Sequence, residues 1–268
     1  ADLIVDVNGF VPDGGSVEPL IPARLLDSRP SGETDDGVSQ REGRVGAGST
    51  TTLKVTDRGG VAADADAVIV NVTAVNPSTN AFLTVFPCGE QRPGASNLNA
   101  AAGSNVNNLV LAKVGAAGTI CVYSSAETHL LVDVAAYVPG GGGLLSIVPA
   151  RLLETRAGSE TADGQSQSTS PVRAGSTTTL QVAGRGGVAE DATGAVLNVA
   201  AIRPDGGGFI TASPCDEDRP QASNVNFGAG AVVSNAVVVK LDSSGDVCLF
   251  STSRTDLAVD VVGYSVDS

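Results

Sequence analysis

The chain lacks the residue types on which most catalytic sites and nucleic-acid surfaces depend. Its 268 residues include no Met, no Trp, a single His and only 3 Tyr and 6 Phe. Basic residues are scarce too, with 16 Lys and Arg against 29 Asp and Glu, which gives a net charge of −13. Nucleic acid and anionic lipid are bound by basic surfaces, so we expect neither as a partner. No apolar run approaches the ~20 residues that cross a bilayer, so we expect no membrane insertion.

What the sequence does contain is a set of short strand-like segments. Val, Ala and Leu supply most of its apolar residues, and 33 Gly and 13 Pro punctuate it. Segments of five to eight apolar or alternating residues between Gly and Pro turns are typical of strands. These strands are expected at 2–11, 50–56, 67–75, 81–86, 107–114, 119–124 and 129–138, and again one repeat later. The pattern predicts an all-β protein with a sandwich-like or barrel-like fold.

The sequence repeats with a period of 127 residues. The segment Pro22-Ala-Arg-Leu-Leu-Asp-Ser-Arg29 returns as Pro149-Ala-Arg-Leu-Leu-Glu-Thr-Arg156, and Arg58-Gly-Gly-Val-Ala62 returns as Arg185-Gly-Gly-Val-Ala189. No insertion separates the copies, so we expect two modules of equal length. Module 1 is placed at 15–139 and module 2 at 144–268, with the four glycines of 140–143 as a flexible hinge.

One strand is present in three copies. The pattern around Asp6 returns around Asp133 and Asp260, each time near the end of a module. Residues 1–14 are therefore a surplus copy of the strand that closes each module. If 2–11 completes module 1, the last copy is free; if each module uses its own final strand, 2–11 is free. A free strand can add to a neighbouring molecule, or it can be the tail of a preceding module. The apolar side of this donor strand consists of Leu3, Val5, Val7 and Phe10.

The four cysteines also follow the repeat. Cys88 and Cys121 are 33 residues apart, and Cys215 and Cys248 stand at the same spacing in the second copy. No CxxC metal spacing occurs, so we predict one disulfide in each module and an oxidising, extracellular location.

Each closing strand carries a carboxylate within an apolar run. A buried carboxylate needs a partner, and the repeated Arg-Leu-Leu segment supplies guanidinium groups. We therefore predict structural ion pairs that fix strand register rather than catalytic carboxylates. The acidic members are Asp6, Asp133 and Asp260, and the basic members are Arg24, Arg29, Arg151 and Arg156.

The residues offer no catalytic or metal-binding pattern. His129, the single histidine, is replaced by Asp256 in the second copy, and no G-x-S-x-G segment supplies a nucleophile. We expect no enzyme activity, no metal and no cofactor. The repeated asparagines at 71, 97, 99 and 108 are interpreted as structural, although Asn side chains also line sugar-binding grooves.

Taken together, these motifs resemble a known module. The order P-x-R-L-L-[DE]-[ST]-R, R-G-G-V-A, V-x-N-V, S-N-[LV]-N and V-D-V-x-G-[YF] is similar to a tandem repeat of secreted actinobacterial surface proteins. In that family the modules often follow exported hydrolases such as amidases or proteases. The resemblance implies extracellular, non-catalytic work, but no catalytic domain accompanies the modules here.

Two functions remain open from the sequence. The first is a structural or adhesive surface protein that assembles head to tail, as a filament, by donating the surplus strand. The second is a carbohydrate or cell-wall binding module, whose partner is a surface glycan. Carbohydrate sites usually present aromatic platforms, and the few tyrosines here, Tyr123, Tyr137 and Tyr264, provide little of one.

Overall fold

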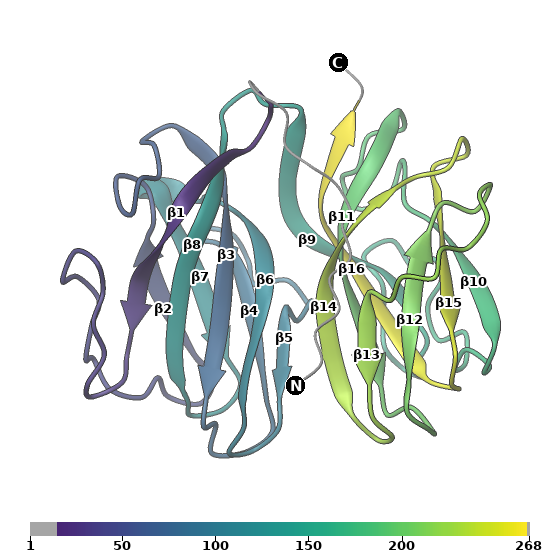
Figure 1. The fold of residues 1–268 in the computed structure, drawn as a ribbon, viewed down its shortest axis with the longest axis horizontal. Coiled ribbons are helices and arrows are strands. Elements are labelled where there is room, and N and C mark those ends of the chain that lie inside the picture. The colour runs from purple at the N-terminus through teal and green to yellow at the C-terminus, as the bar shows by residue number, and fades with distance from the viewer. Residues whose placement is uncertain (1–14, 267–268) are drawn as a thin grey trace.

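The computed structural model describes residues 15–266, and all of its regular structure except one short 3-10 turn is β-strand. Four antiparallel sheets of four strands form two β-sandwiches, which stand side by side (Figure 1). This confirms the predicted all-β fold with two tandem modules.

Module 1 is built from eight strands. They are β1 (Glu18–Asp27), β2 (Ser49–Lys54), β3 (Ala65–Val75), β4 (Ala81–Pro87), β5 (Leu98–Ala100), β6 (Asn105–Lys113), β7 (Thr119–Ser124) and β8 (His129–Pro139). The 3-10 turn spans Ala116–Gly118. One sheet has the order β1-β8-β3-β6 and the other β2-β7-β4-β5.

Module 2 repeats this plan strand for strand. Its members are β9 (Leu144–Glu154), β10 (Ser176–Gln181), β11 (Ala192–Ile202), β12 (Gly208–Ser213), β13 (Val225–Phe227), β14 (Val232–Lys240), β15 (Asp246–Ser251) and β16 (Asp256–Val266). The sheet orders β9-β16-β11-β14 and β10-β15-β12-β13 are those of module 1 shifted by one repeat. The constant period thus reflects a topology that is the same in both copies.

The expected strands are present in both modules, with ends that differ by at most two residues. Two strands were missed in each module. β1 covers the Pro-Ala-Arg-Leu-Leu segment, where register shifts on either side of Ala23 interrupt the alternation. β5 has only 3 residues and is too short to show a period. The alternation fails as a signal where a strand is bulged or very short.

The structure decides which closing strand belongs to which module. β8 lies between β1 and β3, and β16 lies in the same position between β9 and β11. Each module therefore uses the strand at its own C-terminal end, which excludes the alternative in which 2–11 completes module 1. The surplus copy is the first one; it lies outside the described residues, as do Leu3, Val5, Val7 and Phe10.

Each sandwich encloses its own apolar core. In β3, alternate residues Val68, Val70 and Val72 are fully buried, whereas Ile69 and Asn71 on the other side are partly exposed. The facing sheet contributes side chains such as Leu53 and Leu83. Burial of a Val or Leu side chain contributes roughly 1.5–3 kcal/mol, so small β-branched residues are enough to stabilise this sandwich.

The repeated Arg-Gly-Gly sequence has a backbone reason. Gly59 has a φ of 56° and Gly186 a φ of 58°, a region that L-residues rarely adopt. A Cβ placed on either glycine would lie 2.9 Å from the Cβ of Ala23 or Ala150. Both the turn and the close approach of β1 or β9 therefore require glycine.

The two modules are joined by a short turn at 140–143, between the end of β8 and the start of β9. The backbone N–H of Gly143 donates to Ser16 Oγ at 2.6 Å, which ties this turn to the start of module 1. Nothing in the part of the chain from 15 to 266 forms a helix long and apolar enough to cross a membrane.

Candidate interaction surface

Both predicted disulfides are present. Cys88 is bonded to Cys121 and Cys215 to Cys248, and in each case the Cα atoms are 5.0 Å apart. Each bridge joins the end of β4 or its equivalent to the neighbouring strand β7 or β15. Among the described residues no cysteine is free.

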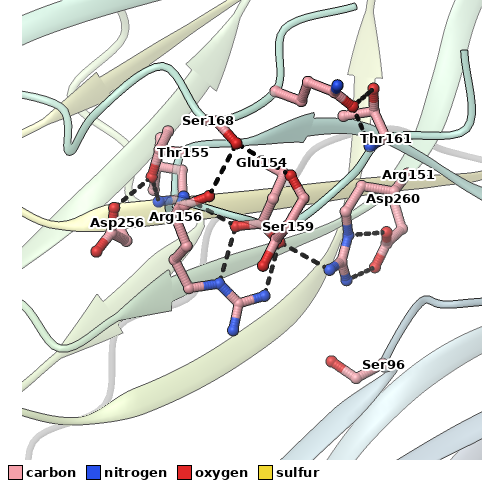
Figure 2. Close-up of polar contacts among 12 residues, drawn as sticks. Ser96, Arg151, Glu154, Thr155, Arg156, Ser159, Thr161, Ser168, Asp256 and Asp260 are labelled. Atoms are coloured by element: carbon pink, nitrogen blue, oxygen red, sulfur yellow. Dashed lines mark hydrogen bonds and ion pairs between the residues drawn. The ribbon is translucent and has the colours of Figure 1, made fainter. Parts of the chain in front are cut away.

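The predicted arginines and strand carboxylates form one network in each module. Arg151 approaches Asp260 with two guanidinium nitrogens, at 2.8 and 3.1 Å, as Figure 2 shows. Arg24 makes the same fork with Asp133 at 2.7 and 3.1 Å. These pairs join β1 to β8 and β9 to β16, where Arg24 stands opposite Asp133 and Arg151 opposite Asp260. Asp6, the third strand carboxylate, lies outside the described residues.

The acidic residue at the centre of this network was not predicted from the sequence. Arg156 does not bind the strand carboxylate; it donates to Glu154 at 2.6 and 2.8 Å, and Arg151 donates to the same Glu154 at 2.9 Å (Figure 2). Arg29 and Arg24 bind Asp27 in the same way. The sequence did contain a sign of this contact, because the acidic residue of the motif, Asp27 or Glu154, stands between two arginines.

The charges of this network alter the pKa values of its members. Burial by itself raises the pKa of Glu154, but hydrogen bonds from Arg156 and the charges of Arg156 and Arg151 outweigh it and hold that pKa below its usual value. The same balance lowers the pKa of Asp27. In both modules the carboxylate is therefore held in its charged form by the adjacent guanidinium groups.

The arginine of the Arg-Gly-Gly turn forms a second pair that the sequence did not reveal. Arg58 binds Asp36 at 2.6 and 2.9 Å, and Arg185 binds Asp163 at 2.7 and 2.9 Å. The hydrogen bonds from these arginines lower the pKa of Asp36 and of Asp163 to about 2. The partners are 22 residues apart in the sequence, so only the folded β1–β2 loop brings them together.

The Ser or Thr hydroxyl of the P-x-R-L-L-[DE]-[ST]-R motif also stabilises the fold. Ser28 Oγ accepts the backbone N–H of Leu130 at 2.9 Å, and Thr155 Oγ1 accepts that of Leu257 at 2.9 Å. Ser28 also contacts His129 Nδ1 at 3.2 Å, where Thr155 donates to Asp256 instead. His129 thus takes a position in a strand contact that an aspartate fills equally well.

A separate apolar cluster joins the two modules. It is formed by side chains on the outer surfaces of the β1-β8-β3-β6 and β9-β16-β11-β14 sheets, the surfaces turned away from each module's core. The buried members are Ala67, Leu111 and Val138 of module 1 and Val196 and Val262 of module 2. Leu111 reaches β16 so closely that a Cβ on Gly263 would lie 2.6 Å from Leu111 Cδ2.

Polar contacts extend this interface along β6. Asn108 Nδ2 donates to Asn198 Oδ1 on β11 at 3.2 Å, and Asn108 Oδ1 accepts the backbone N–H of Ala236 on β14 at 3.2 Å. At the other end of β6, Lys113 Nζ donates to the carbonyl of Ser146 on β9 at 3.4 Å. β6 therefore crosses the whole outer face of the β9-β16-β11-β14 sheet, with β5 beside β14 (Figure 1).

Residues next to β5 complete the contact. Asn198 Nδ2 donates to the carbonyl of Ser96, and Ser234 Oγ lies 3.3 Å from the carbonyl of Asn97 and 3.4 Å from Asn99 Nδ2. We call Ser96, Asn97, Asn99, Asn108 and Leu111 the β6 edge, and Val196, Asn198, Ser234, Val262 and Gly263 the receiving face.

The interface is directional, because the two repeats use different surfaces. Leu111 is 5% exposed and Asn108 3% exposed, since module 2 covers them. Their counterparts one repeat later, Val238 and Asn235, face solvent, and Val238 is 58% exposed. Module 1 thus contributes an edge and module 2 a face.

The repeated asparagines mainly serve the fold, as interpreted from the sequence. Asn97 Oδ1 accepts the backbone N–H of Val85 and Asn224 Oδ1 that of Ala212, which connects β4 or β12 to the following loop. Asn99, Asn108 and Asn198 are the exceptions, because their side chains make contacts between the modules.

An aromatic pair covered by an arginine recurs on the β2-β7-β4-β5 sheet of module 1 and on the equivalent β10-β15-β12-β13 sheet of module 2. Phe82 and Tyr123 lie 5.7 Å apart, and the Arg92 guanidinium is 4.1 Å from the Tyr123 ring. In module 2, Phe209 and Phe250 lie 6.5 Å apart and Arg219 is 3.6 Å from the Phe250 ring. The guanidinium occupies the ring face on which a sugar would stack.

The other buried polar side chains are also hydrogen-bonded. Every buried side-chain nitrogen or oxygen between residues 15 and 266 has a hydrogen-bond partner. Within this range no three His, Cys, Asp or Glu side chains lie close enough together to hold a metal ion.

Comparisons with known proteins identify no family. No family model and no curated protein matches the chain. A chain of the Sulfolobus Turreted Icosahedral Virus structure is similar over 93% of this chain and 90% of its own, with 10% identity and a TM-score of 0.33. The tandem domain CBM22-1-CBM22-2 of Xyn10C from Paenibacillus barcinonensis covers 91% of this chain and 98% of its own, with 10% identity and a TM-score of 0.23. YhaK from Escherichia coli has 9% identity and a TM-score of 0.22 over 80% of this chain and 82% of its own.

Proposed function

We propose that this chain is a non-catalytic structural or adhesive protein of the cell exterior that associates with copies of itself. Its most repeated residues carry this proposal: in both modules the Arg-Leu-Leu-[Asp/Glu] motif is engaged in holding strands together, through Arg24 and Asp133 and through Arg151 and Asp260. Ion pairs that fix the strand register in the same way in both modules favour a structural function over a catalytic one.

Self-association is supported by the surplus closing strand. Residues 3–10 carry the same pattern as β8 and β16, with Asp6 at the position of Asp133 and Asp260. An arginine at the position of Arg24 could donate to Asp6 as Arg24 donates to Asp133. Because both described modules already hold their own closing strand, donation of 2–11 exchanges one such strand for another, as in domain swapping.

The motifs also support membership of the tandem repeat family of secreted actinobacterial surface proteins. The two disulfides require an oxidising compartment to form and persist. An extracellular location and a net charge of −13 are consistent with each other, since charge keeps an exported protein dispersed.

Deletion of residues 1–12 tests the donor strand. The full chain is expected to form filaments or a ladder of 26.6 kDa steps in negative-stain images and light scattering, and the deleted chain shorter assemblies. Asp6→Asn is the milder variant, which keeps the strand but weakens its pairing with arginine. Equal assembly by all three proteins would exclude strand donation.

The second candidate function, binding of a surface glycan, rests on the two arginine-covered aromatic pairs. For a sugar to stack on Tyr123 or Phe250, Arg92 or Arg219 has to move aside and donate to its hydroxyls instead. A glycan array tests this: binding that is lost in Tyr123→Ala and Phe250→Ala would favour the glycan, and no binding by the full chain would reject it.

A further inference from the structure

A pocket between the two modules is lined by Asn, Val and Ser side chains alone. Its volume is about 250 Å³, and it lies where β5 and β6 of module 1 approach β13 and β14 of module 2 (Figure 1). Both modules supply its amides, which are Asn99 from module 1 and Asn224, Asn226 and Asn235 from module 2. None of the described residues that line it is charged. The pocket therefore suits a neutral ligand that both donates and accepts hydrogen bonds.

Three valines form the apolar part of this pocket. Val225 is 3% exposed and belongs to the core of module 2, Val233 packs against that core, and Val106 packs against the core of module 1. Because packing fixes these side chains, the apolar surface is formed before a ligand arrives. The pocket is smaller than the about 300–1,000 Å³ of sites that enclose a whole drug-sized ligand, so it accommodates one unit of a longer molecule.

The first repeat shows which groups such a set of amides binds. Asn108 Nδ2 donates to the carbonyl of Asn97 at 2.6 Å, and it also donates across the interface to Asn198 Oδ1 at 3.2 Å. Asn198 Nδ2 in turn donates to the carbonyl of Ser96. The carboxamide of Asn198 is therefore held by its oxygen and by its nitrogen at the same time.

A hydroxyl group is bound beside this carboxamide. Ser234 Oγ lies 3.3 Å from the carbonyl of Asn97 and 3.4 Å from Asn99 Nδ2. A hydroxyl in this position donates to the carbonyl and accepts from the amide nitrogen. The first repeat thus binds an amide and a hydroxyl as neighbours.

The second repeat has the same residues at these four positions, Ser223, Asn224, Asn226 and Asn235. It also has the same internal hydrogen bonds, because Asn235 Nδ2 donates to the carbonyl of Asn224 at 2.8 Å and Asn226 Nδ2 to Ser223 Oγ at 3.1 Å. The contacts with a carboxamide are not repeated. Among residues 15–266, the second N–H of Asn235 and the carbonyl of Ser223 have no hydrogen-bond partner.

We infer that this pocket binds an N-acetylated amino sugar of a surface glycan. Its acetamido group presents the same C=O and N–H as the Asn198 side chain, so the C=O accepts from Asn235 Nδ2 and the N–H donates to the carbonyl of Ser223. A hydroxyl on the adjacent ring carbon takes the place between the carbonyl of Asn224 and Asn226 Nδ2 that a serine hydroxyl takes in the first repeat. The acetyl methyl group packs on the valines.

This site goes beyond the proposed self-association and does not depend on the closing strand. It also differs from the arginine-covered aromatic pairs, which lie on the β2-β7-β4-β5 and β10-β15-β12-β13 sheets. Because Asn99 and Val106 belong to module 1 and the other lining residues to module 2, the pocket exists only where the two modules meet.

Two matched sugars test the ligand. Chitotriose and cellotriose differ only at C2, which carries an acetamido group in the first and a hydroxyl in the second. Titration of the full chain in a calorimeter is expected to show binding of chitotriose, at least about tenfold tighter than that of cellotriose, because cellotriose lacks both the amide contacts and the methyl group.

Two substitutions test the pocket. Asn235→Ala and Asn226→Ala are each expected to weaken chitotriose binding about tenfold, since each removes a hydrogen-bond donor to the sugar. Both side chains are exposed, so the fold is expected to be kept, and thermal unfolding checks this. Asn107→Ala is the control, because Asn107 is an exposed asparagine of β6 that bonds to Asn71 instead of lining the pocket.

The outcomes separate this inference from the proposed functions. No binding at millimolar chitotriose, equal affinity for cellotriose, or binding of N-acetylglutamine amide without chitotriose would overturn it, the last in favour of a peptide. Chitotriose binding that survives Asn235→Ala and Asn226→Ala but is lost in Tyr123→Ala and Phe250→Ala would reject the pocket and keep the aromatic pairs. Chitotriose binding by a chain that is monomeric at every concentration would support the pocket and reject self-association.

Discussion

The ion pair between the repeated arginine and the strand aspartate is partly exposed in module 1 and buried in module 2. The Asp260 side chain is 2% exposed and that of Asp133 is 25% exposed, although each binds its arginine through two nitrogens. A buried charge without its partner is far more costly than an exposed one. The two modules therefore provide an internal comparison of one interaction in two environments.

Replacing each aspartate with asparagine compares the stability that the pair contributes in the two environments. Asp260→Asn is expected to lower the free energy of unfolding by about 3–5 kcal/mol, because it leaves the Arg151 charge inadequately paired in a buried position. Asp133→Asn is expected to cost about 1 kcal/mol, since solvent reaches Arg24. Urea unfolding of the two variants checks the order; a larger loss in Asp133→Asn would contradict the assignment.

Low pH is expected to lower the free energy of unfolding by breaking the ion pairs that Arg58 and Arg185 form with Asp36 and Asp163. The pKa values of Asp36 and Asp163 are about 2, below the usual 3.8, so their carboxylates favour the folded state. This stability is present above about pH 4 and is lost as pH falls toward 2. With solvent screening, each pair contributes about 1–2 kcal/mol.

Variants that remove the titration test this acid response. The double variant Asp36→Asn with Asp163→Asn is expected to be less stable than the native chain at pH 5 and nearly equal to it at pH 2. Urea midpoints at the two pH values measure the difference. A native-like loss of stability in the variant would place the acid sensitivity in other groups, such as Asp27 and Glu154, whose pKa values are also lowered.

Among the elements, strands with clear alternation could be predicted and the contacts between distant strands could not. β7 was predicted at its full length, because Ile120, Val122 and their neighbours alternate between clear turns. β1 was missed, since bulges around Ala23 disturb its period. The position of β8 in the centre of its sheet was left open, because three copies of one pattern carry no sign of which module each completes.

The Arg-Gly-Gly turn gives a prediction at this scale. Gly186→Ala is expected to cost about 2–4 kcal/mol, because the new Cβ meets Ala150 as well as straining a φ of 58°. Gly175→Ala is the control: its φ is 70°, but no atom lies within 4 Å of the added Cβ, so strain alone of about 1 kcal/mol is expected. Thermal unfolding of both variants measures the packing component, and equal losses would contradict it.

For the whole molecule, the repeat explains why sequence alone could not reveal the interface between the modules. Asn108 and Asn235 are identical in type, yet one is buried against module 2 and the other faces solvent. Each repeat carries both an edge and a face, and only the folded chain shows which of them meet. The edge of module 1 and the face of module 2 meet within the chain, so the proposed self-association rests on the surplus closing strand instead.

The mass of the native chain as a function of concentration tests this account most directly. Light scattering is expected to give 26.6 kDa in dilute solution and a rising mass at high concentration, with deletion of residues 1–12 shifting the rise to higher concentrations. A mass of 26.6 kDa at every concentration, for the native chain, would contradict self-association through the closing strand.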